Sequence, residues 1–120
     1  MGVVHHSHYP VYMEVGRSEF FEEHLLPYQE FEAQGMFAPV LQLELQIVGR
    51  ATYGDVLHLT TRAGWMKGVR LMMSYRIETQ SGAPVATGQT LHALVGADLK
   101  AVHPRKFQEF YNKLRTIFGC

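Results

Sequence analysis

The clearest pattern in the chain is a strict alternation of apolar and polar residues from Leu41 to Ile47. Leucine or isoleucine occupies every second position there, with Gln or Glu between them. A period of two places the apolar side chains on one face of a strand, so this stretch predicts a half-buried β-strand. Three further stretches bounded by turn residues predict additional strands, at 56–63, 69–77 and 85–95. Because short connections join antiparallel neighbours, we expect a four-stranded antiparallel sheet.

Helical spacing occurs before and after the predicted sheet. From Tyr9 to Phe21, apolar residues recur at intervals of three and four, and Pro10 stands in a first helical turn, where its missing N–H is tolerated. Pro27 is expected to end this helix, and Pro104 is expected to open another near the C-terminus. A long helix packed on one face of a curled antiparallel sheet is an α+β architecture.

Chain length, charge and cysteine content narrow the class of protein. With 120 residues the chain predicts one domain, spanning 1–120, and its eleven basic and eleven acidic side chains argue against general nucleic-acid binding. The only cysteine is Cys120, which excludes an intrachain disulfide and a cysteine-based zinc site. No apolar run approaches the roughly 20 residues of a membrane span, and no signal-peptide pattern is present. We therefore expect a cytoplasmic protein that binds neither nucleic acid nor membrane.

Three histidines precede the first predicted helix: His5, His6 and His8. Imidazole is a common metal ligand, but the sequence offers no further ligand beside them, so we expect no metal site. The side chain of His6 could also act as a general acid–base, because its unperturbed pKa lies near neutrality. His6 and Tyr9 are the stronger candidates for a substrate site, whereas His5 and His8 fit ordinary surface or interface positions.

The chain resembles the hotdog-fold acyl-CoA thioesterases of the 4-hydroxybenzoyl-CoA thioesterase type. The matching motifs are, in order, GVVHHSHY at 2–9, Glu14, Arg17, YGD at 53–55, VATGQTLH at 85–92, and Pro104. The resemblance covers nearly the whole chain. It implies a hotdog fold, in which an antiparallel sheet wraps around one central helix, and a homodimer or homotetramer with active sites at the subunit interfaces.

The resemblance also implies a catalytic arrangement at the head of the first helix. In this family the backbone N–H at the position of His6 polarises the thioester carbonyl, and an Asp about seven residues earlier acts as nucleophile or general base. Counting back from His6 places that Asp before Met1, so the acid and the family's first strand are expected to be missing from this chain. Truncation of the chain and loss of the acid both explain this. Glu14 and Glu19 match structural positions better than catalytic ones.

Further residues are assigned to the acyl group and to CoA. We expect Tyr9, Tyr12 and Met13 to bind the acyl part of the substrate. Three basic residues match positions where relatives hold the CoA phosphates: Lys67, Arg70 and Lys100. Arg17 is expected to pair with a carboxylate, for which Asp55 is a candidate.

Two functions follow from these expectations. The first is an acyl-CoA thioesterase that needs no metal or redox cofactor, with the CoA thioester as its substrate. The second is a non-catalytic hotdog protein that binds acyl-CoA or serves in assembly, as the missing acid suggests. Either protein is expected to form at least a homodimer, because an isolated four-stranded sheet leaves its edges unpaired. The sequence does not specify the acyl chain.

Overall fold

The computed structural model describes residue 5 and residues 7–119. Its elements are α1 (His8–His24), α2 (Tyr28–Ala33), β1 (Val40–Ile47), β2 (Leu57–Lys67), β3 (Arg70–Thr79), β4 (Pro84–Ala93), the 3-10 turn η1 (Pro104–Lys106) and α3 (Gln108–Phe118). The four predicted strands and the long first helix are present, which confirms the α+β class. Pro104 opens η1, and α3 follows it at Gln108. Among the described residues, no helix is long and apolar enough to cross a membrane.

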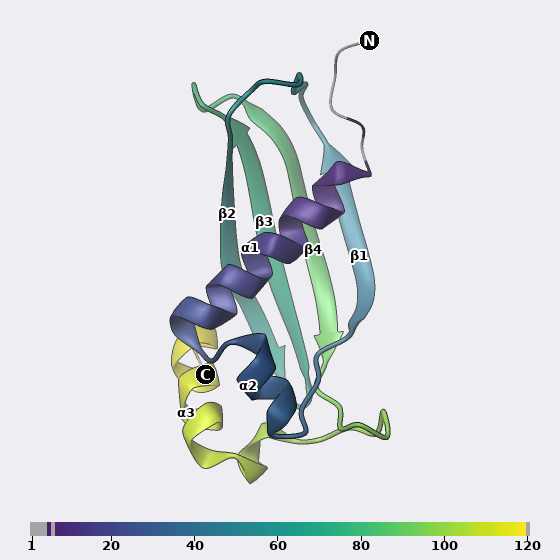
Figure 1. Ribbon diagram of the computed structural model, residues 1–120, viewed down its shortest axis with the longest axis vertical. Coiled ribbons are helices and arrows are strands. Elements are labelled where there is room, and N and C mark those ends of the chain that lie inside the picture. The colour runs from purple at the N-terminus through teal and green to yellow at the C-terminus, as the bar shows by residue number, and fades with distance from the viewer. Residues whose placement is uncertain (1–4, 6, 120) are drawn as a thin grey trace.

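The strands form one antiparallel sheet in the order β1-β4-β3-β2. Because β1 and β2 lie at opposite edges, the segment that joins them crosses one end of the sheet (Figure 1). The helix α1 runs diagonally over one face of the sheet, and α2 and α3 lie together near the opposite end. β1 and β2 each have one strand neighbour in the described sheet, so each presents a free edge.

The side of α1 that meets the sheet carries the buried residues Tyr9, Met13, Gly16, Arg17 and Phe21. Their spacing follows one stripe of a helix. Gly16 allows the helix backbone to approach β2 closely, because a Cβ at this position would overlap the Leu59 side chain and lie 2.5 Å from Oγ1 of Thr61. The contact between α1 and the sheet therefore depends on the absence of a side chain at Gly16.

Strand β3 supplies much of the buried face of the sheet, through Leu71, Met73, Tyr75 and Ile77. Their regular spacing confirms the period of two predicted for this segment. Strand β1 shows the same alternation with a different outcome, because Leu41, Leu43 and Ile47 are 51%, 42% and 51% exposed. The expectation that one face of β1 is buried is therefore wrong for a single chain. β1 is an edge strand, so only β4 lies beside it to cover its side chains.

Strand β2 continues to Lys67, whereas the sequence predicted that it ends at Ala63. The pairing register with β3 shifts between Ala63 and Trp65, which marks a bulge at Gly64. A Cβ on Gly64 would lie 2.8 Å from the carbonyl oxygen of Met72, so the bulge also brings two backbones close together. The bulge interrupts the alternation of β2, which restarts after Gly64. For this reason the end of β2 resembled a connection in the sequence.

Aromatic rings fix the C-terminal end of α1 against α2 and α3. The ring of Phe31 lies 6.4 Å from that of Phe21 and 5.0 Å from that of Phe110. Tyr28 adds an edge-to-face contact with Phe21 at 5.3 Å. This cluster anchors one end of α1, and the N-terminal end of the helix lies near the crossing segment between β1 and β2 (Figure 1).

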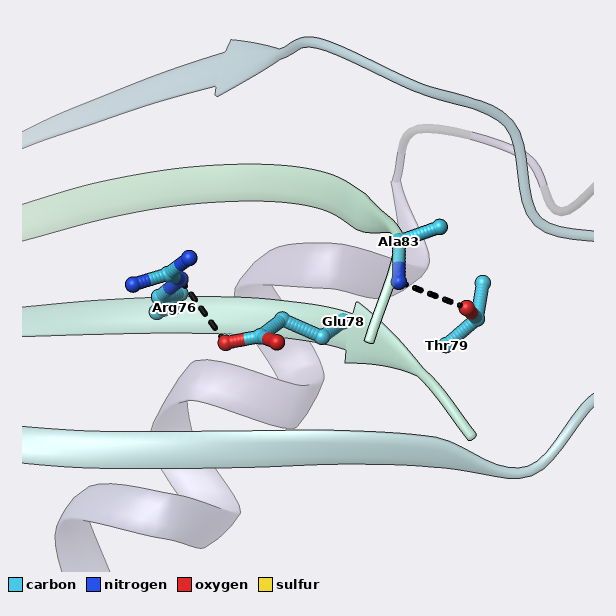
Figure 2. A network of polar contacts seen from close by, with 4 residues as sticks. All are labelled: Arg76, Glu78, Thr79 and Ala83. Atoms are coloured by element: carbon cyan, nitrogen blue, oxygen red, sulfur yellow. Dashed lines mark hydrogen bonds and ion pairs between the residues drawn. The ribbon is translucent and has the colours of Figure 1, made fainter. Parts of the chain in front are cut away.

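Thr79 closes the turn between β3 and β4, as Figure 2 shows. Its Oγ1 accepts a hydrogen bond from the Ala83 N–H at 3.1 Å. We expect Thr79→Val to lower the free energy of unfolding by about 1 kcal/mol, because valine keeps the branched shape and loses this bond. Denaturant titration followed by circular dichroism measures the change. The control Glu78→Gln removes an ion pair with Arg76, whose side chain is 61% exposed, and should cost less than about 1 kcal/mol. A larger loss in the control would contradict this ranking.

Candidate active site

The histidine motif forms a turn that leads directly into α1. The N–H of His8 donates to the carbonyl of His5 at 3.0 Å, and the N–H of Ser7 donates to Nδ1 of His5 at 3.2 Å. Ser7 occupies the N-cap position of α1 without making a side-chain cap hydrogen bond. His5 therefore occupies the N–H groups of Ser7 and His8, and Pro10 has no N–H, which leaves the N–H of Tyr9 as the described first-turn donor at this end of α1. His6, the predicted oxyanion donor, lies outside the described residues.

Aromatic rings gather beside this end of α1. The ring of His8 lies 6.3 Å from that of Tyr12 and 6.4 Å from that of Tyr53. Tyr53 belongs to the segment between β1 and β2, and its side chain is 63% exposed. Sequence reasoning assigned Tyr53 to a turn, because its local pattern carries no signal of a contact with a helix much earlier in the chain. No three His, Cys, Asp or Glu side chains within residues 5 and 7–119 are grouped so that they could hold a metal ion.

A groove of about 610 Å³ lies between α1 and β2, and we call it the α1–β2 groove. Its volume falls within the range of roughly 300–1,000 Å³ found for small-molecule sites. Acidic side chains also line it, among them Glu19 and Asp55. Its apolar walls include Tyr12, Val15, Phe20, Leu57, Leu59 and Ile77. The groove therefore offers an apolar surface along α1 from Tyr12 to the C-terminal end of the helix at His24.

The three residues expected to bind the acyl group differ in exposure. Tyr12 is half-buried and lines the α1–β2 groove. Tyr9 is 2% exposed and packs in a small core cluster with Val85, while Met13 is 1% exposed and contacts Gly88. In this chain Tyr9 and Met13 fill the core between α1 and the sheet. Their assignment to substrate binding remains a prediction.

The three residues expected to hold the CoA phosphates lie far from the head of α1. Lys67 and Arg70 pair across the turn between β2 and β3, and Lys100 is exposed in the loop after β4. Figure 1 shows this turn and this loop at the end of the sheet opposite the N-terminus of α1. His8 contacts Tyr53, just before the start of β2. Since β2 has 11 residues, the two regions are separated by roughly 30 Å. The assignment to CoA remains a prediction.

Arg17 does not pair with a described carboxylate, and the expected ion pair with Asp55 is wrong. Nε of Arg17 donates to the hydroxyl of Tyr28 at 3.2 Å, and Nη1 donates to the hydroxyl of Tyr75 at 3.1 Å. Asp55 instead accepts from the N–H and the hydroxyl of Thr52, at 2.8 and 3.0 Å. The physical reason is orientation, because Arg17 belongs to the buried stripe of α1 and Asp55 closes its own exposed turn.

A buried chain of hydrogen bonds continues inward from Tyr75 to His92. The Tyr75 hydroxyl lies 2.7 Å from Oγ1 of Thr90, which lies 2.7 Å from Nε2 of His92. Nδ1 of His92 lies 3.0 Å from the carbonyl oxygen of Ala38, which can only accept, so the proton of a neutral imidazole sits on Nδ1. Burial, and to a smaller extent the charge of Arg17, lower the pKa of His92 to about 4. His92 is therefore neutral at pH 7, and its Nε2 accepts a hydrogen bond from the Thr90 hydroxyl.

Comparison with known proteins identifies the family. Residues 1–114 match the family described as the thioesterase-like superfamily. The putative acyl-CoA thioesterase YneP of Bacillus subtilis is 25% identical over 118 residues, which are 98% of this chain and 84% of YneP. The hypothetical protein TT1821 from Thermus thermophilus has a TM-score of 0.87 and 36% identity, over 98% of this chain and 88% of that chain.

A second solved structure extends the structural agreement. The DHNA-CoA thioesterase from Staphylococcus aureus has a TM-score of 0.90 and 24% identity, over 98% of this chain and 80% of that chain. At this identity the likeness concerns the fold. The expected hotdog fold is thereby confirmed, and with the match over residues 1–114 the chain belongs to the thioesterase-like superfamily.

Proposed function

We propose that this protein is an acyl-CoA thioesterase that hydrolyses the thioester to a carboxylic acid and CoA, without a metal or redox cofactor. The observation that carries the proposal is the N-terminus of α1, which no side chain caps and which lies within the region matched to the thioesterase-like superfamily. The relative YneP, described as a putative acyl-CoA thioesterase, supports acyl-CoA as the substrate class.

The proposed reaction begins with attack of water on the thioester carbon. The carbonyl oxygen becomes an oxyanion, which the backbone N–H of His6 would stabilise by about 3 kcal/mol. The C–S bond then breaks, and CoA leaves as a thiolate that takes up a proton. The resemblance places the general base on an Asp about seven residues before His6, so we assign it to a position upstream of Met1.

We also propose that the protein acts as a homodimer or homotetramer. The edge strand β1 exposes Leu41, Leu43 and Ile47, and edge-to-edge pairing would cover such side chains. A second copy could also bring a basic region like that around Lys67 and Lys100 close to the head of α1, from which it is separated by roughly 30 Å in one chain, the length of β2. Light scattering that shows a monomer would overturn this assembly.

The activity is tested by adding an upstream extension that carries the Asp and assaying short aliphatic and aromatic acyl-CoAs. We expect turnover of at least one thioester, measured as loss of thioester absorbance. The matched control is the same extension with Asn in place of the Asp, and we expect it to lower kcat by about 100-fold or more, the contribution of a positioned general base.

A second measurement separates the enzyme from the non-catalytic alternative, which the absence of an acidic residue in the first turn of α1 favours. Calorimetric titration with a non-hydrolysable acyl-CoA analogue reports binding independently of turnover. If the extended, oligomeric protein binds the analogue but hydrolyses none of the thioesters, the protein is an acyl-CoA-binding or assembly protein and the proposed activity is wrong.

A further inference from the structure

We propose that a second pocket, with Arg17 at its base, binds a monocarboxylate that has an apolar body. The pocket has a volume of about 590 Å³ and lies between α1, α2, the start of β1 and the loop after β4. We call it the Arg17 pocket. Because β1 and β2 occupy opposite edges of the sheet, the Arg17 pocket and the α1–β2 groove lie on different sides of α1. The inference does not depend on the proposed thioester chemistry.

Arg17 is a buried cation with no counter-ion among the described residues. Its side chain is 8% exposed, and it donates to the hydroxyls of Tyr28 and Tyr75. Burial raises the pKa of Tyr28, so this partner is a neutral phenol. Tyr75 leads to His92, which is neutral as well. Neither of the ion pairs formed within the described residues involves Arg17. Buried charges in proteins are normally paired, so the geometry leaves room for an anion.

Arg17 lines the pocket and uses only Nε and Nη1 in its bonds to the two tyrosines. No fully buried polar side-chain atom in the described part of the chain lacks a hydrogen-bond partner. The N–H groups of Arg17 that bond neither tyrosine are therefore accessible, and the pocket that Arg17 lines provides that access. A guanidinium offers parallel N–H donors that match the two oxygens of a carboxylate, which makes a carboxylate the best-fitting anion.

The remaining lining of the Arg17 pocket selects among anions. Phe37, Val40 and Leu99 give it apolar walls that suit a hydrocarbon or aromatic body. Glu14 and Glu32 line it too, and their charges oppose a ligand with two negative charges about twice as strongly as a ligand with one. A single carboxylate on an apolar body satisfies both conditions, whereas phosphate does not.

Leu99 supplies a second, independent observation. It has a φ of 64°, the only positive φ of a non-glycine residue in the described chain. Its side chain is nevertheless 77% exposed at the pocket. This backbone conformation is unfavourable for leucine, and an exposed leucine gains nothing from burial. Hydrogen bonds from Leu99 N–H to the Gly96 carbonyl and from Gly96 N–H to the Lys100 carbonyl, both 2.9 Å, hold the loop in this form. The loop thereby presents an exposed leucine at the pocket, where it can contact the apolar body of a ligand.

The test is calorimetric titration and thermal-shift measurement of the full chain at neutral pH. The probes are octanoate and benzoate, with inorganic phosphate and the neutral 1-octanol as controls. We expect at least one carboxylate to bind and to raise the melting temperature, with phosphate and octanol at least about tenfold weaker. Arg17→Met, which keeps an unbranched apolar stem and removes the charge, should weaken carboxylate binding by about tenfold or more.

A second pair of variants keeps the test decisive if Arg17→Met does not fold. Leu99→Glu adds a negative charge at the exposed position and should weaken octanoate binding by about fivefold or more. Leu99→Asn suits the left-handed conformation and removes only the apolar contact, so its loss should be smaller. The proposal is overturned if folded wild-type protein binds neither carboxylate, if phosphate binds as tightly, or if Leu99→Glu binds octanoate unchanged. Because free acids are the probes, a negative result leaves the proposed thioesterase activity standing.

Discussion

Replacing Gly16 with valine is expected to lower the free energy of unfolding by about 3 kcal/mol, the upper part of the range for overpacked cores. The Cβ alone would overlap the Leu59 side chain and lie 2.5 Å from Oγ1 of Thr61. Leu59 can turn toward the α1–β2 groove, but the branched side chain of Thr61 has few alternatives on its strand. Valine adds two further methyl groups, so α1 must move away from β2.

The matched control is Glu22→Val, which adds the same branched side chain on the exposed side of α1. It carries the helix-propensity cost of valine without the clash and should lower stability by about 0.5 kcal/mol. Denaturant titration of both variants separates the two effects. Equal stability losses in the two proteins would show that the contact between α1 and β2 does not need a glycine.

The strands could be predicted from the sequence because alternation is a local property of the chain. Burial could not, because it depends on which strands become neighbours. Leu71 and Leu43 stand in equally regular patterns, yet Leu71 is 1% exposed and Leu43 is 42% exposed. β3 lies inside the sheet and β1 at its edge. The bulge at Gly64 shows the other limit, since one inserted residue hid the continuation of β2 from a period-of-two search.

The candidate site was predictable where it depends on a contiguous motif. The turn at His5 and Ser7 runs into α1 as expected, and Tyr12 lines the groove beside it. Tyr53 was missed because only the fold brings it to His8. The basic residues expected at CoA lie at the turn between β2 and β3 and in the loop after β4, and no local pattern in the sequence marks their separation from the head of α1.

Arg17 shows why a partner is harder to predict than a position. Its charge suggested a carboxylate partner. The structure provides hydroxyls instead, from Tyr28 on α2 and Tyr75 on β3. These residues are distant in sequence, and neither carries a charge that would have marked it as a partner. Only the structure shows that no carboxylate among the described residues pairs with Arg17.

Lowering the pH from about 6.5 to about 4 is expected to remove about 3 kcal/mol of stability through His92. Its pKa is lowered from 6.5 to about 4 in the folded protein. Between these values the unfolded chain binds a proton at this residue and the folded chain does not, so acid favours unfolding. The stabilisation is complete above about pH 6.5 and is lost as the pH falls toward 4, at about 1.4 kcal/mol for each unit of the pKa shift.

The measurement is the difference in unfolding free energy between wild type and His92→Gln across this pH range. A glutamine amide can still donate toward Ala38 and accept from Thr90, but it does not titrate. Its stability relative to wild type should therefore rise as the pH falls, because contributions from other titrating groups are common to both proteins and cancel. His58→Gln, at an exposed position on β2, is the control and should retain the pH dependence of wild type.

Parallel curves for His92→Gln and wild type would mean that His92 accepts a proton without disrupting the chain of hydrogen bonds from Arg17 to Ala38. The Thr90 hydroxyl would then have to accept from the Nε2–H of His92 and donate to the Tyr75 hydroxyl, to which Arg17 would still donate.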